Sequence, residues 1–271
     1  MKQLLLAATA VVALSAAAGA AQAQDADYSG FYVGGFVGGA HPAFNDDETI
    51  RFDRNLDGEY NGSGDAFPNF NPGFGGNRAR GVDPGDGFID DESDPIAGLR
   101  VGYDMQMGPW VIGGLAEYEV NNVQDNVSAF STTPANYILT RELDNVAAVR
   151  ARVGYTWRQF LPYVTAGVAR ADVEHSFGTS NGVNTFTPTS TSTESLDGYQ
   201  LGGGVETRVG NVSLGLEYLF TRLDDEAYAV RVSGGPAGNP FTAVNASGTD
   251  LSRSEENFDN HAVRATAAFR F

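Results

Sequence analysis

Three segments of this 271-residue chain share one pattern: an alternating apolar–polar run, a short turn and a second alternating run. They span residues 97–120, 149–173 and 199–220. Two such runs around a tight turn indicate a β-hairpin. One more alternating run lies at 29–40 and another at 260–271, so the sequence predicts eight antiparallel strands.

The two faces of each predicted strand differ in chemistry. In the run 212–221 the apolar face ends in Tyr218 and Phe220, whereas the opposite face carries small residues and the single charge of Glu217. Aromatic residues at strand ends are typical of the girdles of transmembrane barrels. Strands of about ten residues cross a bilayer when they are tilted. The pattern therefore favours a barrel with lipid outside and a few charges inside, rather than a sandwich whose polar face meets water.

The connections between these strands alternate between short and long, as in outer-membrane barrels, where short periplasmic turns alternate with long extracellular loops. The sequence therefore predicts an all-β fold: an eight-stranded antiparallel transmembrane up-and-down β-barrel with four long extracellular loops. The third loop is rich in Ser and Thr, and we expect it to be mobile. The short connections lie at 106–109, 156–160 and 208–211, and the long ones at about 41–94, 121–141, 174–197 and 223–257.

The N-terminus has the features of a secretory signal peptide. Lys2 precedes an apolar run that ends in the small-x-small triplet Ala21-Gln22-Ala23. We expect a signal peptide over residues 1–23 and one barrel domain over 24–271, with a long acidic extracellular loop at about 41–94. After the signal, no run reaches the roughly 18 consecutive apolar residues of a transmembrane helix.

Composition narrows the classes of partner. The chain has no cysteine, so disulfides do not stabilise it. Its net charge is −17, and it lacks the clustered basic residues that bind the phosphate backbone of nucleic acids. We therefore expect no nucleic-acid partner. An acidic exported chain suits divalent cations better than polyanions.

Several motifs in order resemble the small OmpA-like outer-membrane β-barrel family over residues 29–271. They are "GFYVGGFVGG", "RVGYD", "VRARVGY" with "LPYVTAGVA", "GGGVE", "LGLEYLF" and the terminal "VRATAAFRF". The resemblance implies a barrel in the Gram-negative outer membrane, with the lipid bilayer as its surroundings. It also implies that Phe271 is the C-terminal aromatic read by the barrel-insertion machinery. Because the sequence stops there, we expect it to lack the periplasmic peptidoglycan-binding domain of longer relatives.

The inward faces of the predicted strands carry matched charges. An eight-stranded barrel has an interior that side chains fill, and unpaired charges there are costly, so we expect Arg–carboxylate pairs that plug most of the lumen. An ion path through the lumen is the alternative. The residues of this charge network are Arg100, Asp104, Glu117, Glu119, Arg150, Arg152, Glu206, Glu217 and Arg264, with Arg270 nearest the periplasmic end.

The first long loop contains half of a calcium-binding pattern. Asp53, Asn55 and Asp57 occupy positions 1, 3 and 5 of an EF-hand-like loop, Gly58 occupies position 6, and Glu59 would offer its carbonyl at position 7. Position 12 is Gly64 instead of a bidentate Glu. An acidic solvated loop rich in turn residues is the alternative. A second partial pattern lies nearby and contains Asp83, Asp86 and Asp90. Calcium is thus the one candidate cofactor.

The candidate functions follow from this barrel. We expect no catalytic residue, because His41, His175 and His261 lie near the extracellular rim without a Ser or Asp at a diagnostic spacing. The interpretation is a structural protein of the envelope, or an adhesin that contacts an unidentified extracellular partner through its loops. The alternatives are a narrow porin, a rim-sited enzyme and a secreted lipocalin-like barrel.

Overall fold

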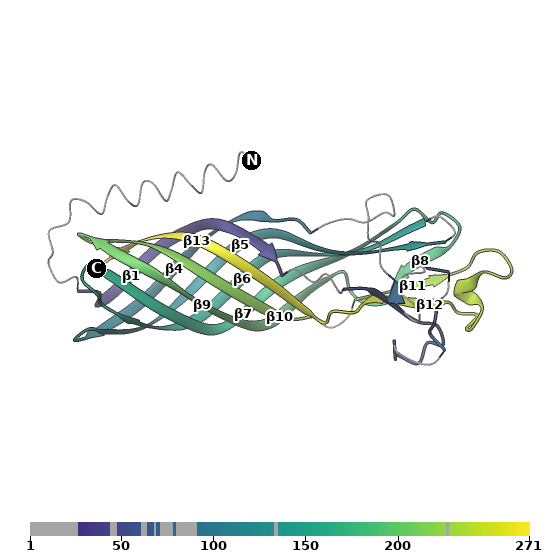
Figure 1. The fold of residues 1–271 in the computed structure, drawn as a ribbon, viewed down its shortest axis with the longest axis horizontal. Coiled ribbons are helices and arrows are strands. Elements are labelled where there is room, and N and C mark those ends of the chain that lie inside the picture. Colours follow the sequence, from purple (N-terminus) through teal and green to yellow (C-terminus); the bar gives the residue numbers. More distant parts are fainter. Residues whose placement is uncertain are drawn as a thin grey trace.

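The first and last strands pair with each other and close the predicted strands into a barrel (Figure 1). In this ring β1 pairs with both β13 and β4, so Val33 lies between Phe269 and Val101. The predicted fold is therefore confirmed, in the order β1-β13-β10-β9-β7-β6-β5-β4 with antiparallel neighbours. The strands are β1 (Gly30–Pro42), β4 (Asp94–Met107), β5 (Trp110–Ser131), β6 (Ala135–Tyr155), β7 (Phe160–Thr179), β9 (Thr193–Val209), β10 (Val212–Asp224) and β13 (Asn257–Arg270).

The structure is a computed structural model, and it describes most of the barrel and parts of its loops. The described residues are 27–43, 48–60, 64–67, 69–70, 78–79, 91–132, 135–225 and 228–271. The expected signal peptide at 1–23 lies outside them.

Three strands are far longer than predicted. β5 has 22 residues, β6 has 21 and β7 has 20. At about 3.3 Å per residue, β5 spans roughly 70 Å along its axis, more than twice the thickness of a bilayer core. The expected long loop at 121–141 is therefore wrong: β5 and β6 pair up to Ser131 and Ala135.

A change in the chemistry of the strand faces explains this extension. Up to Val120 the outward face of β5 is apolar and its inward face carries Glu117 and Glu119. Beyond it, the outward positions become polar, as at Gln124, whereas the inward positions include buried apolar side chains, as at Val123 and Val127, together with the buried Asp125. This is the pattern expected where water replaces lipid around the strands.

The long loops fold into a second, five-stranded sheet with the order β3-β2-β12-β11-β8 (Figure 1). Part of the Ser/Thr-rich segment that we expected to be mobile forms β8, which pairs with β11. A short 3-10 helix, η2 (Pro240–Thr242), follows β11. We call this sheet, η2 and the extended ends of β5, β6 and β7 the loop domain. Its strands are β2 (Ile50–Asp53), β3 (Arg78–Ala79), β8 (Thr185–Pro188), β11 (Ala229–Ser233) and β12 (Thr249–Arg253).

An aromatic cluster forms the core of the loop domain. The Phe52 ring centroid lies 4.9 Å from that of Phe67 and 4.7 Å from that of Phe70, and Phe67 lies 4.8 Å from Phe241. All four side chains are buried, together with Leu139 of β6. Such rings bury large apolar areas, so the loops have a hydrophobic core of their own.

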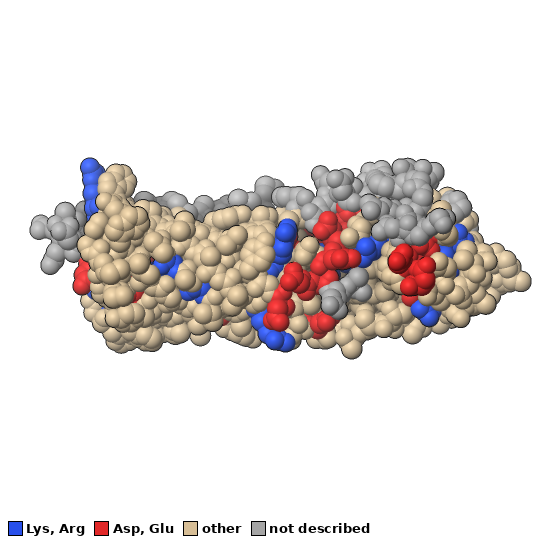
Figure 2. All heavy atoms as spheres, turned by 90° about the horizontal axis from the view of Figure 1, so that it is seen from below, with Lys and Arg blue, Asp and Glu red and all other residues tan. Residues whose placement is uncertain are grey.

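The outer face of the barrel is apolar. Leu99 is 72% exposed, Val168 67% and Val149 61%, although each lies within a regular strand. Figure 2 shows the same on one face, where few charged side chains cover the barrel and acidic and basic side chains gather beyond it. A contiguous exposed apolar surface of this kind is the surface that lipid covers in a transmembrane barrel. Among the described residues, no helix is long and apolar enough to span a membrane.

The substitution Phe52→Ala tests whether the loop domain has an independent core. It removes a fully buried ring, which should cost about 3–5 kcal/mol of the free energy of unfolding of that domain. Hydrogen exchange should then accelerate in β2, β11 and β12, with little change in the barrel strands. The exposed Val244→Ala is the control and should change neither; equal protection of β11 in both variants would contradict the prediction.

Candidate functional site

Four charged side chains pair inside the barrel near the short turns. Arg152 Nη1 lies 2.7 Å from Glu206 Oε1, and Arg152 also pairs with Asp104. Arg270 Nη1 lies 2.7 Å from Asp104 Oδ2, and its Nη2 lies 3.1 Å from Glu206 Oε2. Each arginine thus bridges both carboxylates, and we call this group the lower network.

A second group, the upper network, lies further along the barrel and consists of Arg100, Arg150, Arg264, Glu117, Glu119 and Glu217. Glu217 Oε1 accepts from Arg100 at 3.0 Å, from Arg150 at 3.1 Å and from Arg264 at 2.9 Å. Tyr163 donates to its other oxygen at 2.8 Å. Glu117 pairs with the same three arginines, and Glu119 pairs with Arg264 at 2.8 Å. Three arginines therefore balance three glutamates, which offsets the cost of burying them.

Aromatic rings of β1 complete these networks. Arg264 stacks over the Phe36 ring at 4.3 Å, and Arg270 over the Tyr32 ring at 4.7 Å. Glycines of β4 make room for the rings: a Cβ at Gly98 would lie 2.3 Å from the Phe36 ring. The packing of these rings against the backbone of β4 thus explains why glycines occupy the inward face of that strand.

An apolar layer lies above the upper network and fills the barrel toward the loop end. It comprises buried side chains from every strand of the barrel, and we call it the septum. Leu143, Val173, Leu219, Leu223 and Phe258 have exposed fractions of at most 1%. The complete set is Ala40, Ile96, Val123, Leu143, Val146, Ala148, Ala169, Ala171, Val173, Leu196, Leu219, Leu223, Phe258 and Ala262.

A third charged group lies between the septum and the loop-domain core, and the sequence analysis missed it. We call it the junction cluster: Glu48, Asp125, Arg141, His175, Asp225 and Arg253. Arg253 bridges two carboxylates: its Nε lies 2.7 Å from Glu48 Oε1, and its Nη2 lies 2.8 Å from Asp125 Oδ1. Arg141 joins Asp125 to Asp225, the latter at 2.8 Å. These residues come from barrel strands and from loops far apart in sequence. The inversion of the strand faces at 121–143 could have indicated that Asp125 and Arg141 point inward, but it carries no information about the other four.

Burial acts on the pKa values of His175 and Asp125 in the junction cluster. It lowers the pKa of His175, and Arg141 and Arg253 act in the same direction while Asp225 opposes them. The His175 ring stacks on Tyr228, with ring centroids 5.1 Å apart. Burial also opposes ionisation of Asp125, but Arg141 and Arg253 outweigh it and lower the pKa of Asp125 to about 2. Nearby, burial raises the pKa of Asp91 to about 6.

The other two rim histidines lie on paired positions of β1 and β13. His41 pairs in register with His261. Ser93 Oγ lies 2.7 Å from His41 Nδ1, and the Tyr218 hydroxyl lies 2.7 Å from His261 Nδ1. The three histidines thus occupy two separate environments, one buried and two at the edge of the barrel mouth.

The described half of the expected calcium loop is held by hydrogen bonds within the chain. Asp53 accepts from the backbone N–H of Leu56 at 2.6 Å and of Gly58 at 2.8 Å. Asn55 donates to Asp57, and Asp57 accepts from the backbone N–H of Glu59 at 2.9 Å. In the described parts of the chain, no three His, Cys, Asp or Glu side chains converge as metal ligands would. Asp83, Asp86 and Asp90 lie outside the described residues, so calcium binding stays a prediction.

The C-terminal residue packs on the outside of the barrel at the turn end. Phe271 lies 6.0 Å from Phe31 and 5.2 Å from Phe269, measured between ring centroids, and its backbone N–H donates to Phe31. Its role as an insertion signal stays a prediction.

Residues 7–271 match the outer membrane protein beta-barrel domain family. The chain belongs to this family. It is also similar to the 22 kDa outer membrane protein of Rhizobium leguminosarum bv. viciae, with 32% identity over 128 residues. That match covers 47% of this chain and 52% of the relative, so the chain spans about half the length of the curated relative it matches. Membership of this family places the protein in the Gram-negative outer membrane.

Two crystal structures of outer-membrane proteins are similar to this barrel. The outer membrane protein OprG of Pseudomonas aeruginosa has a TM-score of 0.45 and 13% identity, over 92% of this chain and 100% of that one. Neisserial surface protein A has a TM-score of 0.34 and 12% identity, over 90% and 98%.

The substitution Glu217→Gln tests the energetic weight of the upper network. It keeps the shape of the side chain but leaves three buried arginines with two carboxylates, which should cost about 3–5 kcal/mol of the free energy of unfolding. Urea unfolding of the barrel in detergent micelles measures this cost. Asp197→Asn, at an exposed pair with Arg170, is the control and should cost at most about 1 kcal/mol. Equal costs for the two variants would contradict a buried, interdependent network.

The depressed pKa of His175 predicts how stability depends on pH. Between the folded pKa and the unfolded pKa of about 6.5, the unfolded state binds more protons, so stability contributed by neutral His175 is lost as the pH falls below about 6.5. Relative to His175→Gln, the wild type should lose up to about 1.4 kcal/mol per pH unit in this window. Calorimetric unfolding of both proteins from pH 8 to pH 5 measures the difference, in which the contribution of Asp91 cancels. Parallel curves would show that His175 is not buried neutral.

Proposed function

We propose that this protein is a non-conducting outer-membrane barrel that anchors a folded loop domain at the cell surface, with a role in envelope integrity or adhesion. The observation that carries the proposal is the filling of the barrel interior. The charged side chains of the upper network are almost fully buried: Arg100 is 2% exposed, Arg150 1% and Arg264 0%. The interior of an eight-stranded barrel has room for side chains but not for a wide aqueous channel as well.

The succession of layers supports closure further. An ion that entered from the turn end would meet the lower network, the upper network and then the septum. The charged layers could exchange partners with an ion, whereas the septum offers mostly apolar side chains, with the neutral side chains of Thr221 and Asn260 buried among them. Removing the hydration shell of an ion there would cost far more than the roughly 2–7 kcal/mol of an unpaired polar group.

The architecture outside the barrel supports a display role. The loop domain has its own buried aromatic cluster and a second sheet, and it continues directly from β5, β6 and β7. A barrel that served only to conduct would not require a second hydrophobic core in its loops.

The surroundings of the histidines support a non-catalytic role. His175 lies buried against Tyr228, where a substrate has no access, and His261 contacts Tyr218 on the outer face of the barrel. The contact between His41 and Ser93 lies at the edge of the barrel mouth. We therefore do not extend the proposal to an enzyme.

Planar-bilayer recordings test the closed lumen. The purified full-length protein should give no steady single-channel current at neutral pH, because the septum and both charged networks close the barrel. A steady current would support the narrow porin instead, and its ion selectivity should then change in Glu117→Gln, which neutralises a carboxylate inside the lumen. Asp197→Asn, on the outside, is the matched control and should leave any selectivity unchanged.

A further inference from the structure

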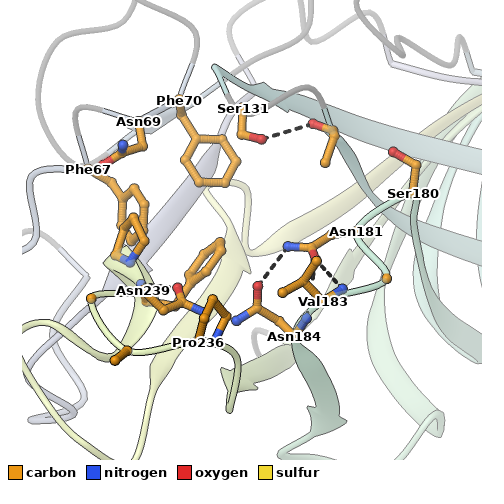
Figure 3. A pocket seen from close by; sticks show the side chains of 16 residues that line it. Phe67, Asn69, Phe70, Ser131, Ser180, Asn181, Val183, Asn184, Pro236 and Asn239 are labelled. Carbon is orange, nitrogen blue, oxygen red and sulfur yellow. Dashed lines mark hydrogen bonds between the residues drawn. The ribbon is translucent and has the colours of Figure 1, made fainter.

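A pocket of about 420 Å³ opens in the loop domain (Figure 3). Four segments that lie far apart in sequence build it: residues 67, 69 and 70, the ends of β5 and β6, the connection between β7 and β8, and the connection from β11 to η2. Its volume lies within the roughly 300–1,000 Å³ that small-molecule sites usually have. Neither the charged networks nor the expected calcium loop contributes a side chain to it.

One wall of the pocket is aromatic. Figure 3 shows the rings of Phe67 and Phe70 on one side of the pocket. With Phe241 they belong to the buried core of the loop domain, so their positions are fixed by packing. Phe67, Phe70 and Phe241 are only 3%, 2% and 5% exposed, so they offer the pocket a small fixed apolar patch, which suits a ligand that presents C–H groups.

Amides that hydrogen bonds hold in place line other parts of the pocket. Asn181 donates to the Tyr137 hydroxyl and to Asn184 Oδ1, each at 2.9 Å. Asn239 caps η2 by accepting from the Phe241 N–H at 2.9 Å and donates to the carbonyl of Gly234 at 3.0 Å. An amide has two donor hydrogens and two acceptor lone pairs, and these bonds of Asn239 use one of each. These amides are therefore preorganised and keep hydrogen-bonding capacity, which lowers the entropic cost of binding.

The described lining of the pocket also carries no formal charge. None of the described residues that line it is Asp, Glu, Lys, Arg or His, although the chain carries 34 acidic and 17 basic residues. A charged ligand would lose its hydration there without a counter-charge in the described lining. The Arg54 guanidinium lies nearby, but it is engaged with the Phe67 ring at 4.8 Å and with the carbonyl of Pro240 at 3.4 Å. The described lining thus favours a neutral ligand over cations and over sulfated or carboxylated groups.

We infer that this pocket is a binding site for a neutral sugar unit, one or two pyranose rings of a surface or host glycan. A pyranose ring has apolar C–H groups for the patch of Phe67, Phe70 and Phe241. It also has neutral hydroxyls for the unused donor and acceptor of the Asn239 amide and for the remaining lone pair of Asn184 Oδ1. The position of the pocket in the loop domain, beyond the barrel, exposes it to the polysaccharides outside the cell. This inference rests on the display role proposed above, and it is independent of whether the lumen is closed.

Saturation-transfer NMR with the full-length protein tests the inference. The detergent must lack a sugar headgroup, and the probes are maltose, cellobiose, lactose and N,N′-diacetylchitobiose, with glucuronate as the acidic comparison. Gly182→Trp is the blocking variant, because Gly182 lines the pocket and an added Cβ there meets no atom within 4 Å. Gly178→Trp is the matched control, because its Cβ is equally unobstructed and the residue lies outside the pocket lining.

We expect transfer to the ring C–H protons of at least one neutral disaccharide, and none to glucuronate. Gly182→Trp should weaken that binding at least tenfold, or about 1.4 kcal/mol, and Gly178→Trp should leave it unchanged. Far-UV circular dichroism verifies that both variants are folded. The inference is overturned if no neutral disaccharide shows transfer, if Gly182→Trp binds as the wild type does, or if glucuronate binds equally well. Absence of binding together with absence of bilayer current would reject the sugar site and leave the closed barrel standing.

Discussion

The medium around the strands changes from lipid to water part-way along them, and the rest of the structure depends on this change. Within the bilayer, the outward side chains must be apolar and every inward charge must find a partner inside the barrel. Beyond the bilayer, the same strands follow the opposite rule and bury apolar side chains inward. Strand β5 shows both rules on one face. Its inward Glu117 belongs to the upper network within the bilayer, and its inward Val127 belongs to the core of the loop domain.

The charged networks fix the register of the barrel as well as filling it. Because successive side chains of a strand point to opposite faces, a shift of one residue in β6 would turn Arg150 and Arg152 toward lipid. Such a state would also take one arginine partner from Glu217 and one from Asp104. The penalty for a wrong register is therefore much larger than the net contribution of the correct pairs, which suits a barrel whose many glycines and alanines specify pairing weakly.

The sequence predicted the membrane-spanning part of the barrel, where apolar side chains point outward along every strand. Glu217 and Arg264 could be assigned to the interior because their neighbours in sequence are apolar and alternate with them. The same reasoning could not assign the junction cluster to the interior. The alternation inverts beside Asp125 and Arg141, and Arg253 belongs to a strand of the loop domain. The pocket was beyond reach for a related reason: its walls come from four separate segments, and local patterns carry no information about which loops meet.

The length of strands β5, β6 and β7 also has a mechanical consequence. Each runs from the barrel into the loop domain as one strand, and their pairing resumes beyond the register shifts at Val120/Val123 and at Leu143/Asn145 (Figure 1). A pull on the outermost loops would therefore load many backbone hydrogen bonds in shear, instead of bending a flexible linker. The loop domain would act as a stiff lever rooted in the bilayer, and it would hold its orientation to the cell surface under flow.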